Sequence, residues 1–450
     1  MIPESRIRFL NDRPVARGRH VLYWMQQSQR AECNHALEYA AFRANELGLP
    51  LVACFGLTAK FPGAQERHYR FMLEGLAGTA RALEKRGVRF VLRLGEPDDI
   101  AVELAKGAAL TVTDRGYLRV QEKWRKRAAG AMRCLLAQVE SDVVVPVEEA
   151  SPKEEFTAGT FRPKILRHLD AHLLPLKTRK LKRDSLGLRF TSEKPDDIDR
   201  LLAKLEIYRR AKRVSWLQGG TAEAARLLEE FIDAKLDRVP EERNDPSKDC
   251  VSRLSPYLHF GQISPLVIAM AVRERRSPGS DIILEELIVR RELAVNFVHY
   301  NPQYDSFNSL PAWASRTLDE HAGDPREYIY SEKEFELSKT HDPYWNAAQK
   351  ELRERGHMHG YMRMYWGKKI LEWSASPRAA YDIALCLNDR YGLDGRDPGG
   401  YAGVAWCFGK HDRAWGSRPV FGKVRYMNDA GLRRKFDIDA YVRRVESYRG

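Results

Sequence analysis

Short apolar runs alternate with amphipathic stretches over residues 20–147, and this alternation constrains the fold more than any other feature. Apolar strands separated by helical stretches are typical of a parallel sheet covered by crossover helices. The sequence therefore predicts an α/β domain with a parallel sheet and Rossmann-like topology over residues 19–148. The apolar runs and helix-like stretches follow one another in the order 20–25, 31–47, 50–57, 66–85, 88–92, 97–106, 109–113, 119–131 and 142–147.

The turn after the first apolar run lacks a glycine-rich phosphate loop. Parallel sheets of this kind bind ligands beyond the carboxyl ends of their strands, and dinucleotide-binding members carry GxGxxG there. Here the sequence is Tyr23-Trp-Met-Gln-Gln27. We therefore expect the Rossmann-like topology without the dinucleotide fingerprint.

Two further regions follow the predicted sheet. Residues 149–220 are rich in proline and basic residues, which predicts a linker that wraps the surface. The basic run at 177–183 is either a solvated face of that linker or a patch for DNA contact or localisation. Residues 221–450 have helical periodicity and predict an all-α domain, with helices expected at 221–236, 265–276, 282–297, 344–355, 360–373 and 376–387.

The charge and composition narrow the range of partners. A net charge of +13 and a pI near 9.4 favour a polyanionic partner, nucleic acid before a membrane surface. No apolar run approaches the ~20 residues that span a bilayer, and residues 1–12 lack the apolar core of a signal peptide. We expect an intracellular protein, cytoplasmic and nucleoid-associated if prokaryotic. The six scattered cysteines argue against a disulfide framework or a zinc site.

Aromatic residues are concentrated in the helical domain. Six of the nine tryptophans lie after residue 300. Trp366 and Trp373 are seven residues apart, so they share one face of a predicted helix at a spacing of ~10 Å. Core packing explains any single tryptophan, whereas a set around a redox cofactor also suits stepwise electron transfer. Arg363 stands alone in the same Met- and aromatic-rich segment and needs a partner if it is buried.

Three polar segments can carry chemistry. Ser252 and Ser255 precede a proline-capped helix, where hydroxyls and free N–H groups can bind phosphate or simply cap the helix. Residues 388–401 form a polar, glycine-rich loop, a kind of segment that often carries function. Residues 410–415 and 422–426 interleave basic and aromatic side chains, as is needed to contact phosphates and stack on bases.

Taken in order along the chain, these segments resemble one family, the class II cyclobutane pyrimidine dimer photolyases. The resemblance extends over nearly the whole chain and is therefore specific, although no single piece is. The matching segments are VLYWM at 21–25, LSPYLHFGQIS at 254–264, EELIVRREL at 285–293, NF at 296–297, THDPYWN at 340–346, HGYMRMYW at 359–366, LNDRY at 387–391, DGRDP at 394–398, HDRAW at 411–415 and GKVRYM at 422–427.

The resemblance implies a light-driven DNA repair enzyme that is a monomer. Its helical domain would hold FAD, and the photoexcited, fully reduced flavin would donate an electron to a pyrimidine dimer flipped out of double-stranded DNA. The N-terminal domain would hold either a deazaflavin or a folate as a second, antenna chromophore, or none. A cryptochrome, which signals instead of repairing, and a DNA-binding protein without catalysis are the alternatives.

The resemblance also assigns cofactor contacts. Arg363 and Asp412 are expected to pair beside the isoalloxazine ring. Asn388 is expected to face flavin N5, because an amide both donates and accepts hydrogen bonds. The remaining residues expected at the cofactor are Ser252, Leu254, Ser255, Asp394 and Asp397.

Electron transfer and substrate contacts follow from the same resemblance. Trp366 is expected nearest the flavin, then Trp345, with Trp373 at the surface end of the chain. Glu286 resembles the family's pocket glutamate. Met364 and Trp406 resemble the wall of the dimer pocket, and the other residues expected to contact substrate or DNA are Arg243, Asn244, Arg290, Arg413, Trp415, Lys423 and Arg425.

Overall fold

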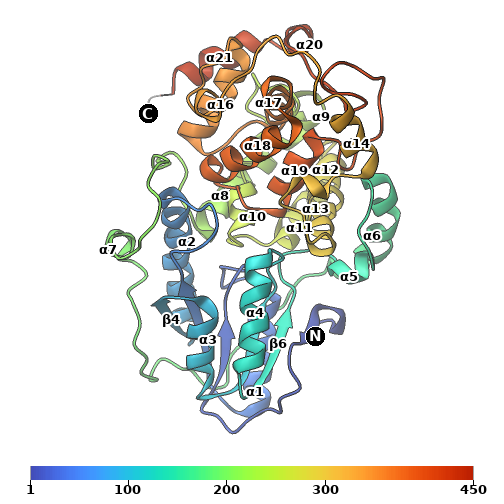
Figure 1. The fold of residues 1–450 in the computed structure, drawn as a ribbon. Coiled ribbons are helices and arrows are strands. Elements are labelled where there is room, and N and C mark those ends of the chain that lie inside the picture. Colours follow the sequence, from blue (N-terminus) through green and yellow to red (C-terminus); the bar gives the residue numbers. More distant parts are fainter. Residues whose placement is uncertain (1, 449–450) are drawn as a thin grey trace.

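A six-stranded sheet forms the core of the N-terminal region in the computed structural model, which describes residues 2–448 (Figure 1). The strand order is β1-β6-β5-β2-β3-β4, with β1 antiparallel to β6 and all other neighbours parallel. The strands are β1 Ile7–Phe9, β2 His20–Trp24, β3 Leu51–Leu57, β4 Arg89–Leu94, β5 Ala108–Asp114 and β6 Leu135–Val139.

Helices cover both faces of this sheet. Alternate residues of a strand point to opposite faces, so Val21 and Tyr23 pack in one apolar cluster while Leu22 and Trp24 pack in another. The first cluster contains α1 (His35–Leu47) and α2 (Glu66–Lys85), and the second contains α3 (Pro97–Ala105) and α4 (Arg119–Ala131). From β2 the chain first adds β3 and β4 on one side and then returns to add β5 and β6 on the other side. Sheets of this type form a ligand crevice at such a point, here between β2 and β5.

The predicted fold class is confirmed, but one predicted strand is wrong. Residues 142–146 form an irregular segment, Val147 begins a helix, and the sixth strand is β6, earlier in the chain. The N–H groups of Val144 and Val145 donate to the carboxylate of Glu292 instead of to a neighbouring strand. A buried apolar run does not by itself distinguish a strand from a packed connection.

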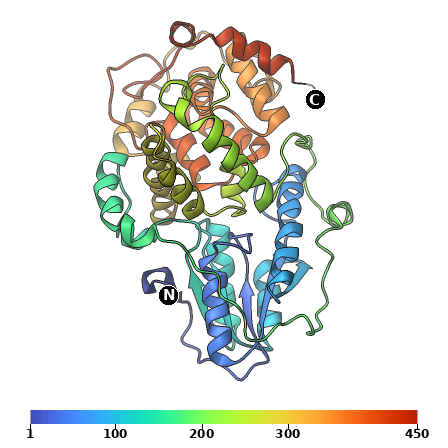
Figure 2. The same ribbon diagram turned by 180° about the vertical axis from the view of Figure 1, so that it is seen from behind.

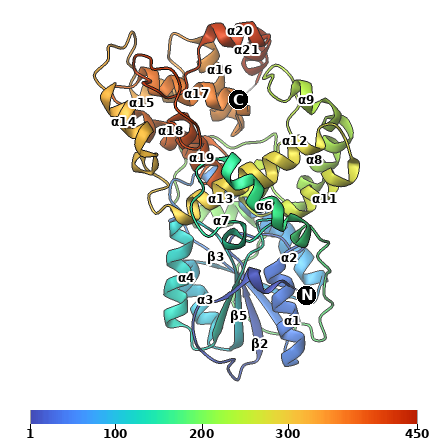
Figure 3. The same ribbon diagram turned by 90° about the vertical axis from the view of Figure 1, so that its right-hand side faces the viewer.

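Most helices after residue 146 stack on the carboxyl end of the sheet (Figure 3), whereas residues 173–220 are mainly irregular. The linker contains α6 and α7, and part of it covers the edge of the sheet, where Glu193 N–H donates to Leu92 O (Figure 2). The helices are α5 Val147–Ala150, α6 Ala158–His172, α7 Ile198–Ala203, α8 Thr221–Ala234, α9 Val239–Glu242, α10 Ser255–His259, α11 Pro265–Arg275, α12 Ser280–Leu284, a π-helix Glu285–Arg290, α13 Arg291–Tyr300, α14 Ala312–Glu320, α15 Glu332–Glu336, α16 Pro343–Arg355, α17 Gly360–Trp373, α18 Pro377–Tyr391, α19 Pro398–Cys407, α20 Asp429–Lys435 and α21 Ile438–Glu446.

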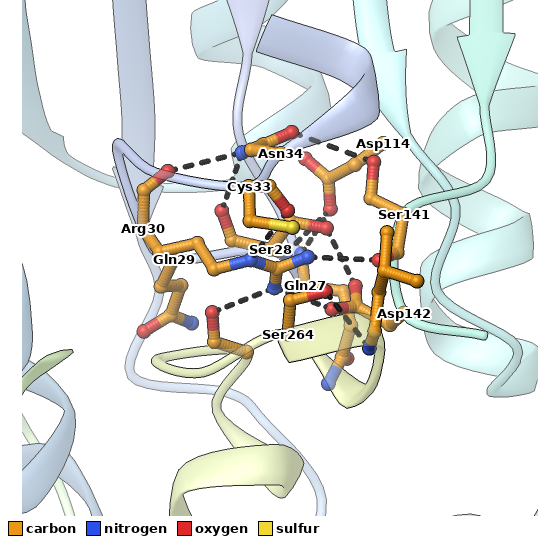
Figure 4. Close-up of polar contacts among 12 residues, drawn as sticks. Gln27, Ser28, Gln29, Arg30, Cys33, Asn34, Asp114, Ser141, Asp142 and Ser264 are labelled. Carbon is orange, nitrogen blue, oxygen red and sulfur yellow. Dashed lines mark hydrogen bonds and ion pairs between the residues drawn. The ribbon is translucent and has the colours of Figure 1, made fainter. Parts of the chain in front are cut away.

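A buried polar network joins the sheet to the helical region (Figure 4). Arg30 and Asp142 form an ion pair at 2.6 Å, with side chains only 1% and 4% exposed. Arg30 also donates to Gly261 O, in the turn after α10, at 2.9 Å. Asp114, at the end of β5, accepts the backbone N–H groups of Gln26 and Ser28, each at 2.8 Å. The turn after β2 is therefore held by β5 and by the helical region together.

Gly261 makes this contact sterically possible. Its φ is +64°, and a Cβ atom there would lie 1.9 Å from Gln27 O. Only glycine adopts this conformation without strain and leaves room for the facing backbone. The distance between the two regions is thus set by backbone packing as well as by the ion pair.

We predict that Asp142→Ala lowers the free energy of unfolding by about 3–5 kcal/mol, because it leaves the Arg30 guanidinium buried without a counter-charge. Urea unfolding measures the change. The matched control is Glu103→Ala, which breaks the more exposed Arg93–Glu103 pair and should cost less than about 1 kcal/mol. Equal, small losses in both variants would contradict a structural role for the network.

Candidate active site

Arg363, Asn388 and Asp394 form the centre of the polar site in the helical region. Arg363, from α17, donates to Asn388 Oδ1 at 2.7 Å and to Asp394 Oδ1 at 3.2 Å. Burial raises the pKa of Asp394, but attraction to Arg363 and His357 outweighs that effect and holds the pKa below its usual value. The structure therefore corrects the expected partner of Arg363, which is Asp394 and not Asp412.

The local sequence explains how these three groups meet. Helix α18 begins at Pro377 behind the N-cap Ser376 and brings Asn388 into its last turn. The chain then turns back, and Gly395 N–H donates to Gly392 O. Asn388 is 2% exposed, and its amide nitrogen donates to Asp389 Oδ1 at 3.0 Å. Because an amide nitrogen carries two donors, Asn388 keeps one for a ligand.

The serine segment lies beside this centre. Ser252 Oγ accepts the Leu254 N–H at 3.4 Å, and the Ser255 hydroxyl helps to lower the pKa of Asp394. A cavity of about 210 Å³ adjoins the segment and has several cations in its wall. Among residues 2–448, Arg444 Nε is buried there without a hydrogen-bond partner. The cavity walls include Lys248, Arg253, Arg355, His357, Arg444 and Trp216.

Three tryptophans, one from α16 and two from α17, form a contiguous set. The indole N–H of Trp345 donates to Trp366 O at 3.0 Å, and the rings of Trp345 and Trp373 are 6.3 Å apart. Trp345 therefore contacts both of the others. Trp373 is 4% exposed but lines a surface cleft of about 550 Å³. The Trp366 indole N–H donates to Gln349, a partner that sequence analysis did not identify.

Glu286 lies in the π-helix and pairs with Arg243, whose guanidinium donates to its carboxylate. The Glu286 side chain is 51% exposed and open to a ligand. Arg290 lies near Glu285 instead, at 3.6 Å. Asn244 is exposed. The structure thus brings Glu286 and Arg243 together and leaves Asn244 and Arg290 at the periphery.

A second polar group surrounds Asp412, which accepts Arg425 Nε at 3.1 Å. The Arg425 guanidinium lies 4.2 Å from the Trp415 ring centroid and 5.6 Å from that of Trp406. Arg413 lies 4.9 Å from the Trp415 ring. The side chains of Arg413, Trp415 and Lys423 are exposed, so this group forms a cationic and aromatic surface.

Met364 and Trp406 are brought together by adjacent helices, α17 and α19. The thiol of Cys407, next to Trp406, lies 3.9 Å from Met364 O. Both Met364 and Trp406 are partly exposed.

Asp397 is the N-cap of α19 and pairs with His259 at 3.3 Å, away from Arg363. Sequence analysis missed Lys368, a lysine on the buried side of α17.

A separate cleft opens at the carboxyl ends of β2 and β3. Aromatic and apolar side chains line most of it, including Phe55, Phe61 and Trp124. In the described part of the chain, three buried polar atoms in this cleft have no hydrogen-bond partner: Gln26 Nε2, Gln29 Oε1 and Tyr69 OH. Unpartnered buried polar groups are costly, so the cleft is suited to a flat ligand with donors and acceptors.

Within residues 2–448, none of the helices has the length and apolar composition to cross a bilayer.

Comparisons with known proteins identify relatives of this chain. The family description "DNA photolyase" matches residues 21–182. Deoxyribodipyrimidine photo-lyase of Methanothermobacter thermautotrophicus is 55% identical over 446 residues, covering 99% of each chain. The enzyme of the same name from Potorous tridactylus is 42% identical, covering 94% of this chain and 81% of its own, and that from Oryza sativa is 40% identical, covering 99% and 91%.

Solved structures support the fold. A bacterial class III photolyase from Agrobacterium tumefaciens superposes with a TM-score of 0.74 at 23% identity, covering 96% of this chain and 87% of its own. An archaeal photolyase from Sulfolobus tokodaii, described with two FAD molecules, gives a TM-score of 0.71 at 16% identity, covering 94% and 89%. The full-length relatives at 40–55% identity establish the family. This chain belongs to the DNA photolyase family.

Proposed function

We propose that this protein reverses cyclobutane pyrimidine dimers in double-stranded DNA by light-driven electron transfer, and that it is a class II enzyme and a monomer. The observation that carries the proposal is the Arg363–Asn388–Asp394 group, whose arginine shares α17 with two members of the tryptophan set, together with the cationic, aromatic surface around Asp412. We assign repair to residues 221–450, light harvesting to residues 19–148, and a linker to residues 149–220.

The residues of the site fit FAD. The unpartnered Arg444 Nε and the surrounding cations suit a diphosphate, and Ser252, Leu254 and Ser255 would hold it from the other side. Arg363 and Asp394 would flank the ring system, and Asn388 would offer its free amide N–H to it. When bound, FAD supplies the light-absorbing electron donor of the repair reaction.

The remaining assigned residues divide between electron supply and substrate. Trp366, Trp345 and Trp373 would carry electrons inward from the cleft that Trp373 lines. Glu286, held by Arg243, would contact the flipped dimer, and Met364 and Trp406 would form its wall. Arg413, Trp415 and Arg425 would enter and brace the opened duplex, while Asn244, Arg290 and Lys423 would contact the DNA at its edge.

A second chromophore is supported by the cleft at the carboxyl ends of β2 and β3. Its aromatic lining suits a flat ring system, and the free groups of Gln26, Gln29 and Tyr69 suit its polar edge. We propose this cleft as the antenna site, for either a deazaflavin or a folate. The position fits the rule that sheets of this kind bind ligands beyond their carboxyl ends.

Light-dependent repair is the direct test of the proposed function. Purified, chemically reduced protein is mixed with a duplex that contains one thymine dimer, and the remaining dimer is measured in light and in darkness. We expect dimer loss only in light. Binding of the dimer without loss under illumination would indicate a light sensor of the cryptochrome type instead.

Replacing Trp366 with Phe should abolish photoreduction of the bound flavin by an external reductant, because it removes the inner member of the tryptophan chain. Repair by chemically reduced Trp366→Phe enzyme should remain close to wild type. Trp313→Phe, in α14 and outside the chain, is the matched control and should photoreduce normally. Photoreduction at the wild-type rate in Trp366→Phe would contradict the proposed route.

Arg413→Ala should weaken binding to a dimer in duplex DNA by roughly 1–3 kcal/mol and binding to a dimer in single-stranded DNA by less, since only the duplex has a gap to fill. Lys423→Ala is the comparison variant, because a phosphate contact should weaken both substrates equally and depend on salt. Titrations at two salt concentrations measure both effects. Equal losses on both substrates in Arg413→Ala would make Arg413 a phosphate contact only.

A further inference from the structure

Lys368 is a buried cation that the proposed function does not use. Its side chain lies on α17 with 0% of the residue exposed. The Nζ donates to Cys407 O, at the last residue of α19, at 2.6 Å. Within residues 2–448, its ammonium forms no ion pair with a carboxylate at 4.0 Å or less. The Lys368 ammonium also lies over the Trp406 ring, whose centroid is 5.1 Å from Nζ.

Holding this charge in the interior disfavours folding. Burial lowers the pKa of Lys368 to about 8, against opposing effects of Cys407 and Asp412, while Arg425 lowers it further. The pKa in the folded protein is thus below the unfolded value, so the stability linked to this group is present at high pH and is lost as the pH falls through about 8. At neutral pH the protein keeps Lys368 charged although a neutral side chain would be more stable there.

The position of Lys368 shows where the charge acts. Two cations lie near the Trp406 ring, Lys368 at 5.1 Å and Arg425 at 5.6 Å from its centroid. The same helix end contacts Met364 O through the Cys407 thiol. Lys368 therefore adjoins Trp406 directly and reaches the backbone of Met364 through Cys407, next to the two side chains proposed as the wall of the dimer pocket. A buried group that costs stability beside a site is best explained by a role in that site.

We propose that Lys368 is a positioning residue for repair, which holds Trp406 through the end of α19 and places a fixed positive charge behind the dimer. The proposal rests on the proposed function. The reduced flavin, excited by light, is the one-electron donor, and the dimer gains one negative charge when it accepts the electron. That negative charge is attracted to the Lys368 ammonium. No proton moves: the two carbon–carbon bonds that join the pyrimidines break, and the electron then returns to the flavin, so that the negative charge is lost again.

Two neutral variants separate the charge from the hydrogen bond. Lys368→Gln retains a donor for Cys407 O without the charge, and Lys368→Met removes both. Lys333→Met, on the exposed helix α15, is the matched control. The holoenzymes are compared by repair yield per absorbed photon after chemical reduction, by quenching of the reduced flavin's fluorescence on adding dimer DNA, by DNA affinity and by melting temperature.

We expect both Lys368 variants to lose repair yield and fluorescence quenching by about fivefold, the order expected for one missing charge at short range. Their affinity for dimer DNA should change less than about twofold, because the ammonium does not touch DNA. Lys368→Met should melt at the wild-type temperature or above it, since the buried charge is gone. Lys333→Met should match the wild type in every measurement.

The pH profile gives an independent signature. The wild-type yield should fall as the pH rises through about 8, where Lys368 loses its proton, and both variants should be flat in that range. The other groups that face Lys368 are Cys407, Asp412 and Arg425. Burial raises the pKa of the Cys407 thiol to about 11, so it ionises outside this range.

A wild-type yield in Lys368→Gln would overturn the proposal, because the charge would then be unnecessary. A lower melting temperature with flavin loss in Lys368→Met would overturn it as well, since Lys368 would be a structural lysine. If the wild type itself fails to repair dimers in light, the proposed function fails together with the proposal. If the wild type repairs dimers and Lys368→Gln repairs them with the same yield, the Lys368 proposal is contradicted and the proposed function is not.

Discussion

The buried ion pair between Arg30 and Asp142 is the contact on which the arrangement of the two regions depends. Arg30 follows β2, Asp142 follows β6, and the guanidinium also donates to Gly261 O beyond α10. A desolvated pair stabilises a structure only when its other hydrogen bonds are satisfied, and here backbone carbonyls of both regions complete the set. The carboxyl end of the sheet, with its open cleft, is thereby fixed against the helices that carry the proposed repair site.

Charge pairing also organises the proposed repair site, in two separate groups. Arg363, Asn388 and Asp394 form the inner group, and Asp412, Arg425 and Trp415 form the outer one. Lys368 lies between α17 and α19, beside the outer group, and has no carboxylate partner in the described residues. Paired charges hold side chains in place, whereas a buried unpaired charge acts on whatever enters the pocket beside it.

Periodicity and motif order predicted the architecture, but not how the charged side chains pair. The i, i+7 spacing correctly placed Trp366 and Trp373 on one helix, because helical geometry is local. The segment 142–147 was misassigned because a buried apolar run looks alike in a strand and in a packed connection. Arg363 was paired with Asp412 instead of Asp394, since both acids follow it in sequence and only tertiary packing decides between them. Lys368 was missed because nothing in the sequence shows that its ammonium is buried.

The central claim is that light absorbed by pigments bound to this chain drives dimer repair. An action spectrum of repair, measured on the purified reduced protein with a dimer-containing duplex, tests it most directly. The account predicts that repair per incident photon follows the absorption of the reduced flavin, with a further band if the cleft beside β2 holds an antenna. Repair that proceeds equally in darkness, or an action spectrum unrelated to the bound pigments, would contradict it.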